Sequence, residues 1–362
     1  MSSNKCFVIV AGGTGGHVMP AIAVAETLKE SGFSIHWLGT QKGIEARIVP
    51  PLGIPLHFIP VQGLRGKGFK SWLLAPFQIL RALIEALKIL NTLKPCGVLS
   101  MGGYVTGPAG LAAWILRIPL ILHEQNSISG LTNRLLAPFA KRILLGFPKT
   151  FTQSKAHVTG NPIRKSILQA LPKTMRNTSD PLRILIIGGS LGAHFFNQIV
   201  PKALKLCSRA FAFEVWHQTG EKEFVETQLR YEEINSVRVE PFIENMGEAY
   251  VWADLVICRS GALTISELAA IGVPSILIPF PHAVDDHQSY NARYLVDANA
   301  AILLPQSLLT PECLSKTIKQ LAQDRQKLSL MADKCRSVAQ IQATEQVAKN
   351  CIEVSCGISP SL

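Results

Sequence analysis

The stretch that decides the fold reads Leu-Val-Ile-Cys (255–258), Arg-Ser-Gly (259–261), Ala-Leu-Thr-Ile-Ser-Glu-Leu-Ala-Ala-Ile (262–271), Gly272 and Val-Pro-Ser-Ile-Leu-Ile (273–278). An apolar run, a turn of small residues, a helical segment closed by glycine and a second apolar run predict a βαβ unit. Strands of this kind are buried on both faces, and ligands bind beyond their carboxyl ends. The alternative is an ordinary βαβ unit followed by a solvated loop.

The turn after the first strand of this unit has the features of an anion site. Ser260, Gly261 and Thr264 lie where the helix begins, and the free amides and dipole of a helix N-terminus favour an anion. Glu267 follows in the same helix, within reach of sugar hydroxyls beside a bound phosphate. Residues 279–291 form a dense polar cluster after the second strand, which suits carbohydrate recognition.

Length and charge restrict the class of protein. A chain of 362 residues is long for one hydrophobic core, so two domains are expected. The net charge of +11 indicates anionic partners such as nucleotides or phospholipids. The basic residues are spread along the chain rather than clustered, which argues against nucleic acid.

Cysteine usage and termini predict a cytosolic protein without a metal. The eight cysteines form no Cys-x-x-Cys pair, so neither a disulfide framework nor a zinc site is indicated. No signal peptide precedes the first apolar run. Residues 95–116 contain no charged side chain, but their glycines and prolines do not suit a membrane span.

The N-terminus repeats the strand–turn–helix pattern. An apolar strand at 6–10 is followed by Ala-Gly-Gly-Thr-Gly-Gly-His (11–17) and a helix at 19–28. Glycines in such a turn let the backbone approach a phosphate, but their spacing is not that of the dinucleotide fingerprint. His17 ends the loop, and because histidine side chains ordinarily titrate near neutrality it is a candidate general base. The alternative role of His17 is a hydrogen bond at the helix entry.

The rest of the first half continues the alternation of strands and helices. Strands are predicted at 98–101, 119–122 and 142–145, and helices at 109–116 and 129–141. A second glycine-rich turn lies at 102–107, and the polar sequence His-Glu-Gln-Asn (123–126) ends a strand. Glu124 at this strand end is the rival of His17 as base, or else orients an acceptor. The pattern predicts a doubly wound α/β domain.

Residues 63–84 allow two interpretations. Large apolar side chains at Trp72, Leu73, Phe77 and Leu80 alternate with the cations Arg65, Lys67, Lys70 and Arg81. An apolar surface rimmed by cations is typical of docking on anionic lipid. The alternative is an amphipathic helix that packs on the core and has a basic outer face.

The second half of the chain repeats the pattern of strand, glycine turn and helix. Strands are predicted at 183–187, 213–217 and 237–243, a glycine turn at 188–193, a helix from Phe195, and helical sequence over 311–350. We expect an N-terminal domain of residues 1–164, to which a C-terminal helix at about 338–362 returns, and a second domain of residues 165–337. Two such domains face a cleft, so the ligand is expected to have two parts.

Six stretches together resemble the MurG family, the bacterial N-acetylglucosaminyltransferases of peptidoglycan synthesis. They are Gly-Gly-Thr-Gly-Gly-His (12–17), Gly-Gly-Tyr-Val-Thr-Gly-Pro (102–108), His-Glu-Gln-Asn (123–126), Gly-Asn-Pro-Ile-Arg (160–164), Gly-Gly-Ser (188–190) and Arg-Ser-Gly-Ala-Leu-Thr-Ile-Ser-Glu (259–267). The resemblance covers nearly the whole chain in order. It departs at Leu191, where the family usually has glutamine, which affects any side-chain contact there but not a backbone phosphate cradle.

The resemblance implies two Rossmann-like domains of the glycosyltransferase-B architecture. It also implies transfer of GlcNAc from UDP-GlcNAc to the muramyl 4-hydroxyl of undecaprenyl-pyrophosphoryl-MurNAc-pentapeptide (lipid I), with inversion, to give lipid II. No cofactor is expected, and because the chain has no Asp-x-Asp motif a metal-free mechanism is predicted. The implied location is peripheral, on the cytoplasmic face of the bacterial inner membrane, with other cell-wall or division proteins as further candidate partners.

The resemblance also assigns roles to residues. Ile243 recognises uracil through its backbone, and Glu267 binds the ribose hydroxyls. The residues implied to hold the donor diphosphate are Ser190, Arg164 and the helix start Ala262, Leu263 and Thr264. Gln288 and Asn126 are implied to contact GlcNAc or its neighbours, and Thr14, Gly15 and Gly16 to face the acceptor pyrophosphate or the donor. Ile265 and Ser266 complete the substrate-binding set.

Two alternatives share parts of this pattern. Another glycosyltransferase-B enzyme, for example one that glycosylates a diacylglycerol, would share the donor half. The second glycine turn and residues 123–126 favour lipid I instead. A non-catalytic nucleotide-sugar binder could keep Glu267 while losing His17 and Arg164, and this chain has all three.

Overall fold

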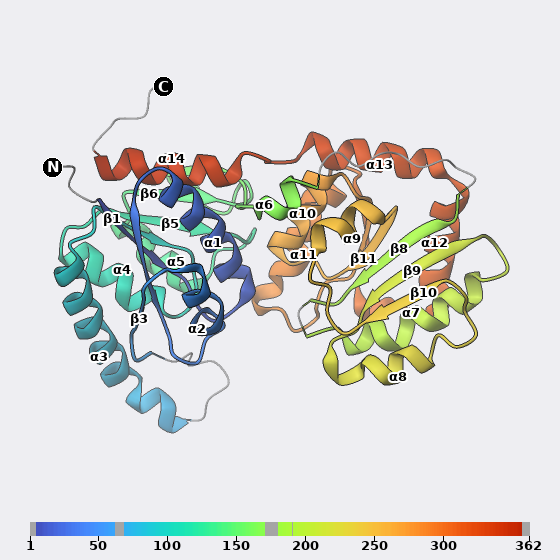
Figure 1. Ribbon diagram of the computed structural model, residues 1–362, viewed down its shortest axis with the longest axis horizontal. Coiled ribbons are helices and arrows are strands. Elements are labelled where there is room, and N and C mark those ends of the chain that lie inside the picture. Colours follow the sequence, from blue (N-terminus) through green and yellow to red (C-terminus); the bar gives the residue numbers. More distant parts are fainter. Residues whose placement is uncertain (1–4, 62–68, 171–179, 190, 357–362) are drawn as a thin grey trace. The chain divides into compact units, whose positions relative to one another are not determined.

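The computed structural model describes residues 5–61, 69–170, 180–189 and 191–356. The chain forms two units, one of residues 1–164 with 341–362 and the other of residues 165–340 (Figure 1). Each unit is built on its own parallel sheet with alternating helices. The predicted fold class, two Rossmann-like doubly wound domains, is confirmed.

Unit 1 contains a seven-stranded sheet in the order β3-β2-β1-β4-β5-β6-β7, with every pairing parallel. The chain begins in the middle, runs outward to β3, and then crosses to β4 on the other side of β1. The strand order therefore reverses between β1 and β4, where open α/β sheets bind ligands. The strands are β1 (Cys6–Val10), β2 (Ser34–Gly39), β3 (Leu56–Phe58), β4 (Gly97–Ser100), β5 (Leu120–Glu124), β6 (Arg142–Leu145) and β7 (Ala156–Val158).

Helices cover both faces of this sheet because its strands are apolar on both sides. Phe7 and Ile9 of β1 pack in one buried cluster, and Val8 and Val10 pack in another. The first cluster includes side chains of α1 and α14, and the second includes side chains of α3 and α4. The helices are α1 (Gly15–Glu30), α2 (Glu45–Ile48), α3 (Phe69–Leu93), α4 (Thr106–Ile115), α5 (Leu131–Leu136) and α14 (Ala343–Cys356), with short 3₁₀ turns η1 (Pro50–Leu52) and η2 (Ala137–Phe139).

The C-terminal helix α14 belongs to unit 1 and is tied to its sheet by a charged pair. Nη1 of Arg142, on β6, donates to Oε2 of Glu353 over 2.8 Å, and both side chains are largely buried. α14 also packs against α1 (Figure 1). Removal of either partner would leave a poorly solvated charge.

Unit 2 contains a six-stranded parallel sheet in the order β10-β9-β8-β11-β12-β13. Its strand order reverses between β8 and β11, so the expected ligand position is beyond the carboxyl ends of these two strands. The strands are β8 (Leu182–Ile187), β9 (Phe213–Gln218), β10 (Val237–Glu240), β11 (Leu255–Cys258), β12 (Ser275–Leu277) and β13 (Ala301–Leu303).

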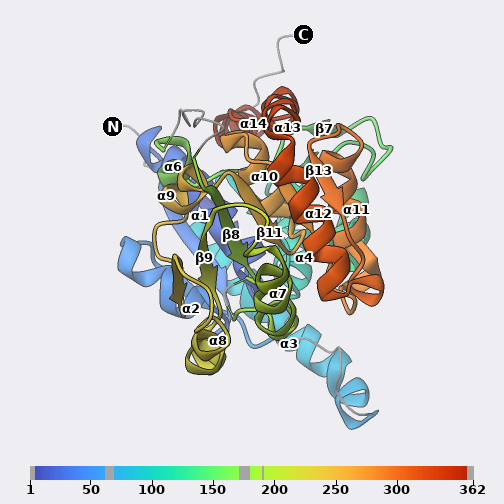
Figure 2. The ribbon, with the colours of Figure 1, turned by 90° about the vertical axis from the view of Figure 1, so that its right-hand side faces the viewer.

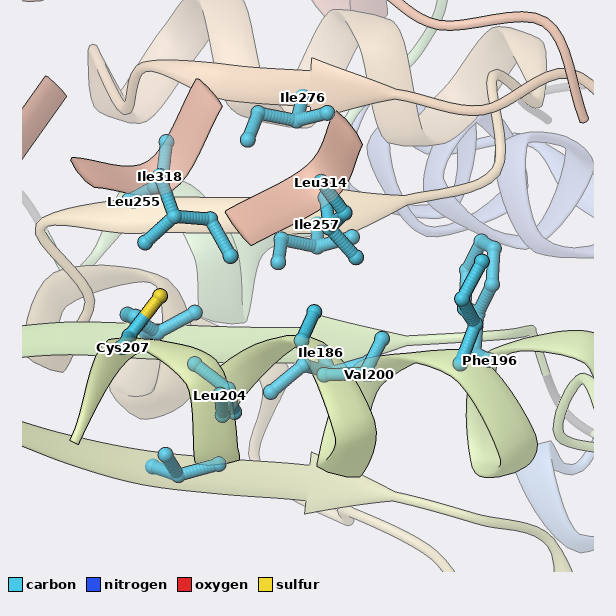
Figure 3. Packing of buried hydrophobic residues seen from close by; sticks show 14 of the residues in the cluster. Ile186, Phe196, Val200, Leu204, Cys207, Leu255, Ile257, Ile276, Leu314 and Ile318 are labelled. Atoms are coloured by element: carbon cyan, nitrogen blue, oxygen red, sulfur yellow. The ribbon is translucent and has the colours of Figure 1, made fainter. Parts of the chain in front are cut away.

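The core of unit 2 lies between its sheet and two helices, α7 and α12, that lie side by side (Figure 2). Figure 3 shows Val200 and Leu204 of α7 near Ile186 of β8, with Leu314 and Ile318 of α12 on the same core. Each such side chain contributes about 1.5–3 kcal/mol when fully buried. The helices are α6 (Lys165–Leu168), α7 (His194–Cys207), α8 (Phe224–Leu229), α9 (Met246–Trp252), α10 (Ala262–Ile271), α11 (His287–Val296), α12 (Pro311–Gln323) and α13 (Arg325–Ser337), with 3₁₀ turns η3 (Glu221–Glu223), η4 (Val284–Asp286) and η5 (Gln306–Leu308).

Several boundaries differ from the sequence prediction. The strand predicted to reach Ile243 ends at Glu240, because Pro241 cannot donate to a ladder. The helical sequence over 311–350 is divided among α12, α13 and α14, with the last helix beginning at Ala343. The helix predicted over 129–141 is the shorter α5 followed by a 3₁₀ turn that contains Pro138.

Candidate active site

Two glycine loops of unit 1 meet at its strand-order reversal. One follows β1 and the other follows β4, which are neighbours in the sheet. Gly103 has φ +92°, and a Cβ there would lie 2.3 Å from the carbonyl oxygen of Gly12. Any side chain at this position would force the loops apart, so glycine is required by both conformation and space.

His17 lies on the first turn of α1, against the second glycine loop. Its Nδ1 is 3.2 Å from Oγ1 of Thr14, the residue that precedes the helix. A Cβ on Gly102, where φ is +97°, would lie 2.7 Å from Cδ2 and 3.0 Å from Nε2 of His17. When the Thr14 hydroxyl accepts from Nδ1–H, Nε2 carries the lone pair that a general base needs. Gly15 and Gly16 form the start of the same helix.

Glu45 stabilises the first glycine loop through a hydrogen bond, and the sequence analysis did not predict this role. Its carboxylate is fully buried and accepts hydrogen bonds from the amide of Gly13 (3.1 Å) and from the amide (2.9 Å) and hydroxyl (2.8 Å) of Thr40. The sequence signal for Glu45 is weak, because Ile44 and Ala46 flank it in a segment that also contains Lys42 and Arg47. Buried charges of this kind are normally paired or fully hydrogen-bonded.

Glu124 at the end of β5 is buried and engaged by several donors. Oε1 accepts from the amide of Asn126 (3.0 Å), and Oε2 accepts from the amide of Gly130 (2.9 Å) and from Nδ2 of Asn133 (2.9 Å). A carboxylate that orders its own loop in this way is better suited to positioning than to proton abstraction. The geometry therefore favours the orienting role for Glu124 and leaves His17 as the stronger candidate base.

The neighbouring residues extend this polar edge of unit 1. Nε2 of His123 lies 3.0 Å from the carbonyl oxygen of Gly160. Burial lowers the pKa of His123 to about 4, and the hydrogen bond with Gly160 opposes that shift only in part. Asn126 and Arg164 are each half-buried, at the ends of the segments that follow β5 and β7. The structure thus gathers the predicted residues of unit 1 at one edge of its sheet.

In unit 2 the glycine turn after β8 is fixed by its neighbour after β9. A Cβ on Gly192 (φ +74°) would lie 1.8 Å from the carbonyl oxygen of Thr219, and one on Gly220 would lie 2.2 Å from that of Leu191. The Leu191 side chain is 90% exposed, so only its backbone takes part in this packing. Ser190, predicted to contact the diphosphate, lies outside the described residues.

The start of α10 presents the amides of the predicted anion site. Ala262, Leu263 and Thr264 form the first turn, whose N–H groups have no intrahelical acceptor. Ile265 differs, because its side chain is fully buried and its amide donates to Gly261. The Ser266 hydroxyl donates to the carbonyl oxygen of Ala262 over 3.0 Å. The first three amides of α10 are therefore the candidates for the predicted anion contacts, whereas Ile265 and Ser266 make hydrogen bonds within the helix.

Glu267 is oriented by a residue that the sequence prediction did not include. The Tyr250 hydroxyl, on α9, donates to Oε2 of Glu267 over 3.1 Å. The Glu267 side chain is only 6% exposed, so its carboxylate lies just below the surface. Ile243 lies in the loop between β10 and α9 and is also buried. No pattern in the sequence relates residue 250 to residue 267, because the contact arises from the packing of α9 on α10.

Arg259 and Gln288 shape the loop after β12. Nη1 of Arg259 donates to the carbonyl oxygens of Ile278 (3.1 Å) and Pro279 (3.0 Å), and the guanidinium lies 4.5 Å from the ring centroid of Phe196. Burial lowers the pKa of Arg259 to about 10, which still leaves it charged at neutral pH. Oε1 of Gln288 accepts from the amide of Phe280 over 2.9 Å. The amide nitrogen of Gln288 is therefore the group suited to a sugar oxygen.

Two Rossmann-like units, each with a glycine loop at its strand-order reversal, are the glycosyltransferase-B architecture. Within the ranges that the structure describes, no three His, Cys, Asp or Glu side chains are grouped as a metal ion would require. The metal-free mechanism stays a prediction.

Comparisons with known proteins identify the family. Residues 7–145 match the Glycosyltransferase family 28 N-terminal domain, and residues 183–350 match the Glycosyltransferase family 28 C-terminal domain. The chain is 50% identical over 360 residues to the UDP-N-acetylglucosamine--N-acetylmuramyl-(pentapeptide) pyrophosphoryl-undecaprenol N-acetylglucosamine transferase of Marinobacter nauticus, which covers 98% of this chain and 99% of that one. The protein of the same name from Shewanella pealeana is 47% identical over 358 residues, with 98% of each chain covered.

A solved structure agrees. The crystal structure of MurG from Acinetobacter baumannii has a TM-score of 0.83 and 40% identity, covering 96% of this chain and 99% of that one. The chain belongs to the MurG family of glycosyltransferases, as the resemblance predicted. None of the helices in the described ranges is long and apolar enough to span a membrane.

Proposed function

We propose that this chain transfers GlcNAc from UDP-GlcNAc to the MurNAc 4-hydroxyl of undecaprenyl-pyrophosphoryl-MurNAc-pentapeptide, inverting the anomeric centre and forming lipid II. The observation that carries the proposal is the 50% identity to the Marinobacter nauticus transferase over 98% of this chain. The site geometry supports it, because unit 2 offers an anion site beside an oriented carboxylate and unit 1 offers a histidine held at two glycine loops.

Unit 2 is assigned to the donor. The amides of Ala262, Leu263 and Thr264 at the start of α10 are assigned to the diphosphate, and Glu267 follows one turn later in the same helix. Tyr250 holds one oxygen of Glu267, which prepares the carboxylate to accept from the two ribose hydroxyls. Ile243 is assigned to uracil, and Gln288 and Asn126 to GlcNAc or its neighbours. The contacts of Arg164 and Ser190 with the diphosphate stay predictions.

Unit 1 is assigned to the acceptor and to proton transfer. As the 4-hydroxyl attacks the anomeric carbon, Nε2 of His17 takes its proton, while Thr14 holds Nδ1. The glycine loop around Thr14, Gly15 and Gly16 is assigned to the acceptor pyrophosphate. Negative charge develops on the departing UDP, and the helix N-terminal amides of α10 stabilise it.

Exposed apolar side chains of unit 1 support binding to a membrane surface. Phe77 is 73% exposed and Leu80 is 54% exposed on α3, so neither is a core residue. The interpretation of residues 72–80 as a core-facing helix is therefore wrong at these two positions, whereas the side chain of Trp72 lies outside the described residues. The docking surface is defined here as Phe77, Leu80 and Ile84, which are exposed and recur at helical spacing on one face of α3.

Cations accompany this docking surface. Arg81 and Lys88 are exposed on the same helix as Phe77 and Leu80. An apolar surface with neighbouring cations suits a peripheral site on anionic lipid. The name of the Marinobacter nauticus relative includes an undecaprenol-linked acceptor, which would lie in such a membrane. We assign the chain to the cytoplasmic face, where a nucleotide-sugar donor is present, with other cell-wall or division proteins as further candidate partners.

Transfer of labelled GlcNAc tests the proposal. The purified protein is incubated with UDP-[¹⁴C]GlcNAc and a short-chain lipid I analogue, and the product is separated and digested to establish the linkage. The proposal expects a β-1,4-linked disaccharide on the lipid. Labelled transfer to diacylglycerol but not to the lipid I analogue would replace it with the diacylglycerol alternative.

A further inference from the structure

A cavity of about 630 Å³ in unit 1 lies beside the first glycine loop and has no role in the site described so far. Its walls come from the segments after β2 and β3, from α3, and from Tyr104. The Tyr104 ring lies 3.5 Å from the position of a Cβ on Gly13, so the cavity adjoins the loop that leads to His17. Its volume is within the usual range for a small-ligand site, about 300–1,000 Å³.

The wall nearest the glycine loop is rigid. Thr40, which lines the cavity, is buried and donates through both its amide and its hydroxyl to Glu45. Glu45 also accepts from the amide of Gly13. One buried carboxylate thus fixes the cavity wall and the catalytic loop relative to each other. A group bound in the cavity would be held at a defined position beside the loop.

The cavity combines apolar and polar surfaces. Buried Ile59 and Val61 lie on its floor, next to the more exposed Phe58 and Pro60. The carboxamides of Gln41 and Gln78 also line it. Amide side chains beside an apolar floor match the alternating N–H, C=O and side-chain groups of a peptide.

Two cations complete the lining. Lys42 follows β2 and Arg81 lies on α3, and both are exposed. Glu85 lies one turn further along α3 and has its own partner, because its Oε2 is 3.6 Å from Nζ of Lys88. Lys42 and Arg81 therefore face the cavity with a net positive charge, which suits a carboxylate. Gln78 and Arg81 come from the middle of α3, whereas Gln41 and Lys42 come from the segment after β2.

We propose that this cavity binds the peptide of the acceptor, with Arg81 and Lys42 contacting a peptide carboxylate. The inference rests on the proposed function, and it concerns how the acceptor is positioned. In a muramyl acceptor the peptide is attached through the lactyl ether on C3, next to the attacking 4-hydroxyl, whereas the pyrophosphate is on C1 across the ring. The cavity beside the His17 loop is therefore placed for the substituent nearest the reacting oxygen.

The experiment compares two acceptors that differ only in the peptide. Both are short-chain pyrophosphoryl-MurNAc lipids in detergent, one with the pentapeptide and one whose lactyl group is capped as a methylamide. Initial rates of GlcNAc transfer are measured for the wild type, Lys42→Ala, Arg81→Ala, the double variant and Arg81→Lys. Lys141→Ala, which removes an exposed cation of unit 1 outside the cavity, is the matched control.

The expected result is a change that depends on the peptide. The double variant should raise KM for the pentapeptide acceptor about 10-fold, as expected for partly exposed charged contacts. Its KM for the capped acceptor should stay within about 2-fold of the wild type. Arg81→Lys should recover most of the single-variant effect, and Lys141→Ala should behave as the wild type.

Three outcomes would overturn the inference. An equal rise in KM for both acceptors would assign the cavity to the sugar or the pyrophosphate. No change in either KM would remove the cavity from acceptor binding. A wild type that does not discriminate between the two acceptors would exclude a peptide contact. Absence of transfer to both acceptors by the wild type would instead contradict the proposed function.

Discussion

The amide of Gly13 donates to Oε2 of Glu45 over 3.1 Å, and that carboxylate is fully buried. The hydrogen bond joins the glycine loop to a residue 32 positions away. Because the amide of Gly13 has this acceptor within the protein, the loop does not need a bound ligand to satisfy it. Because His17 lies on the first turn of the helix that follows, its position depends on this internal support.

Glu45→Ala should destabilise unit 1 and slow turnover together. The variant leaves three donors without an acceptor, so the free energy of unfolding should fall by about 3 kcal/mol. Glu45→Gln should cost less, about 1–2 kcal/mol, because its amide oxygen still accepts. Urea unfolding measures the loss, and hydrogen exchange at the Gly13 amide should become faster. Glu26→Gln on α1 is the control, and equal stability of all variants would contradict this role for Glu45.

The Tyr250–Glu267 pair should control donor affinity. Glu267→Ala should weaken UDP binding by about 1.5–3 kcal/mol, and Tyr250→Phe by about 0.5–1.5 kcal/mol. The smaller effect is expected because the tyrosine only orients the carboxylate. Calorimetry with UDP provides both values, with Glu248→Gln, an exposed residue of α9, as the control. An unchanged UDP affinity in Glu267→Ala would remove the ribose contact.

The free energy of unfolding should fall as the pH is lowered, and His123 should account for part of that fall. Burial lowers the folded-state pKa to about 4 from the usual 6.5, so the unfolded chain binds a proton that the folded chain does not. This contribution is fully present above pH 6.5 and is lost as the pH falls toward 4, amounting to about 3 kcal/mol. His123→Gln should flatten the pH dependence of the free energy of unfolding in urea, whereas His157→Gln at an exposed site should not.

His217 of unit 2 also lowers the free energy of unfolding at acidic pH. Burial lowers its pKa to about 3, so wild-type stability retains an acid dependence even without His123. Only the difference between the wild type and His123→Gln reports on His123. A pH dependence identical in these two proteins would show that His123 is not neutral in the folded state at pH 5.

The docking surface should bind anionic vesicles. Phe77→Ser with Leu80→Ser should reduce binding about 10-fold without changing thermal stability, because both side chains are exposed. Binding should also weaken as salt rises, since the neighbouring cations are screened. Val225→Ser with Leu229→Ser, two exposed residues of α8, is the control in a sedimentation assay. Equal vesicle binding by both double variants would move the membrane contact elsewhere.

Local sequence patterns predicted the sheets and most of the loops that carry the site. The segment from β11 to α10 was predicted with its helix bounds, because apolar runs and a terminating glycine specify it locally; Gly272 indeed has φ +77°. The edge strands β3 and β7 were not predicted, since three residues are too few to show a period.

Long-range contacts could not be predicted in the same way. Glu267 was identified from its place in a helix, but Tyr250 reaches it only because α9 packs against α10. Glu45 supports Gly13 because the segment after β2 folds back beneath the first loop. Neither relationship has a spacing that a helix or strand would impose. The donor set of Glu124 also appears only when residues 126–133 are folded around it.

Steady-state kinetics of His17→Ala and Glu267→Ala test the central claim most directly, which is that unit 2 binds the donor and unit 1 supplies the base. With UDP-GlcNAc and a lipid I analogue both varied, His17→Ala should lower kcat by about 10²–10⁴-fold while donor KM and UDP affinity stay near those of the wild type. Glu267→Ala should instead raise donor KM, with kcat largely retained. A His17→Ala enzyme that keeps wild-type kcat at saturating donor and acceptor would contradict the account.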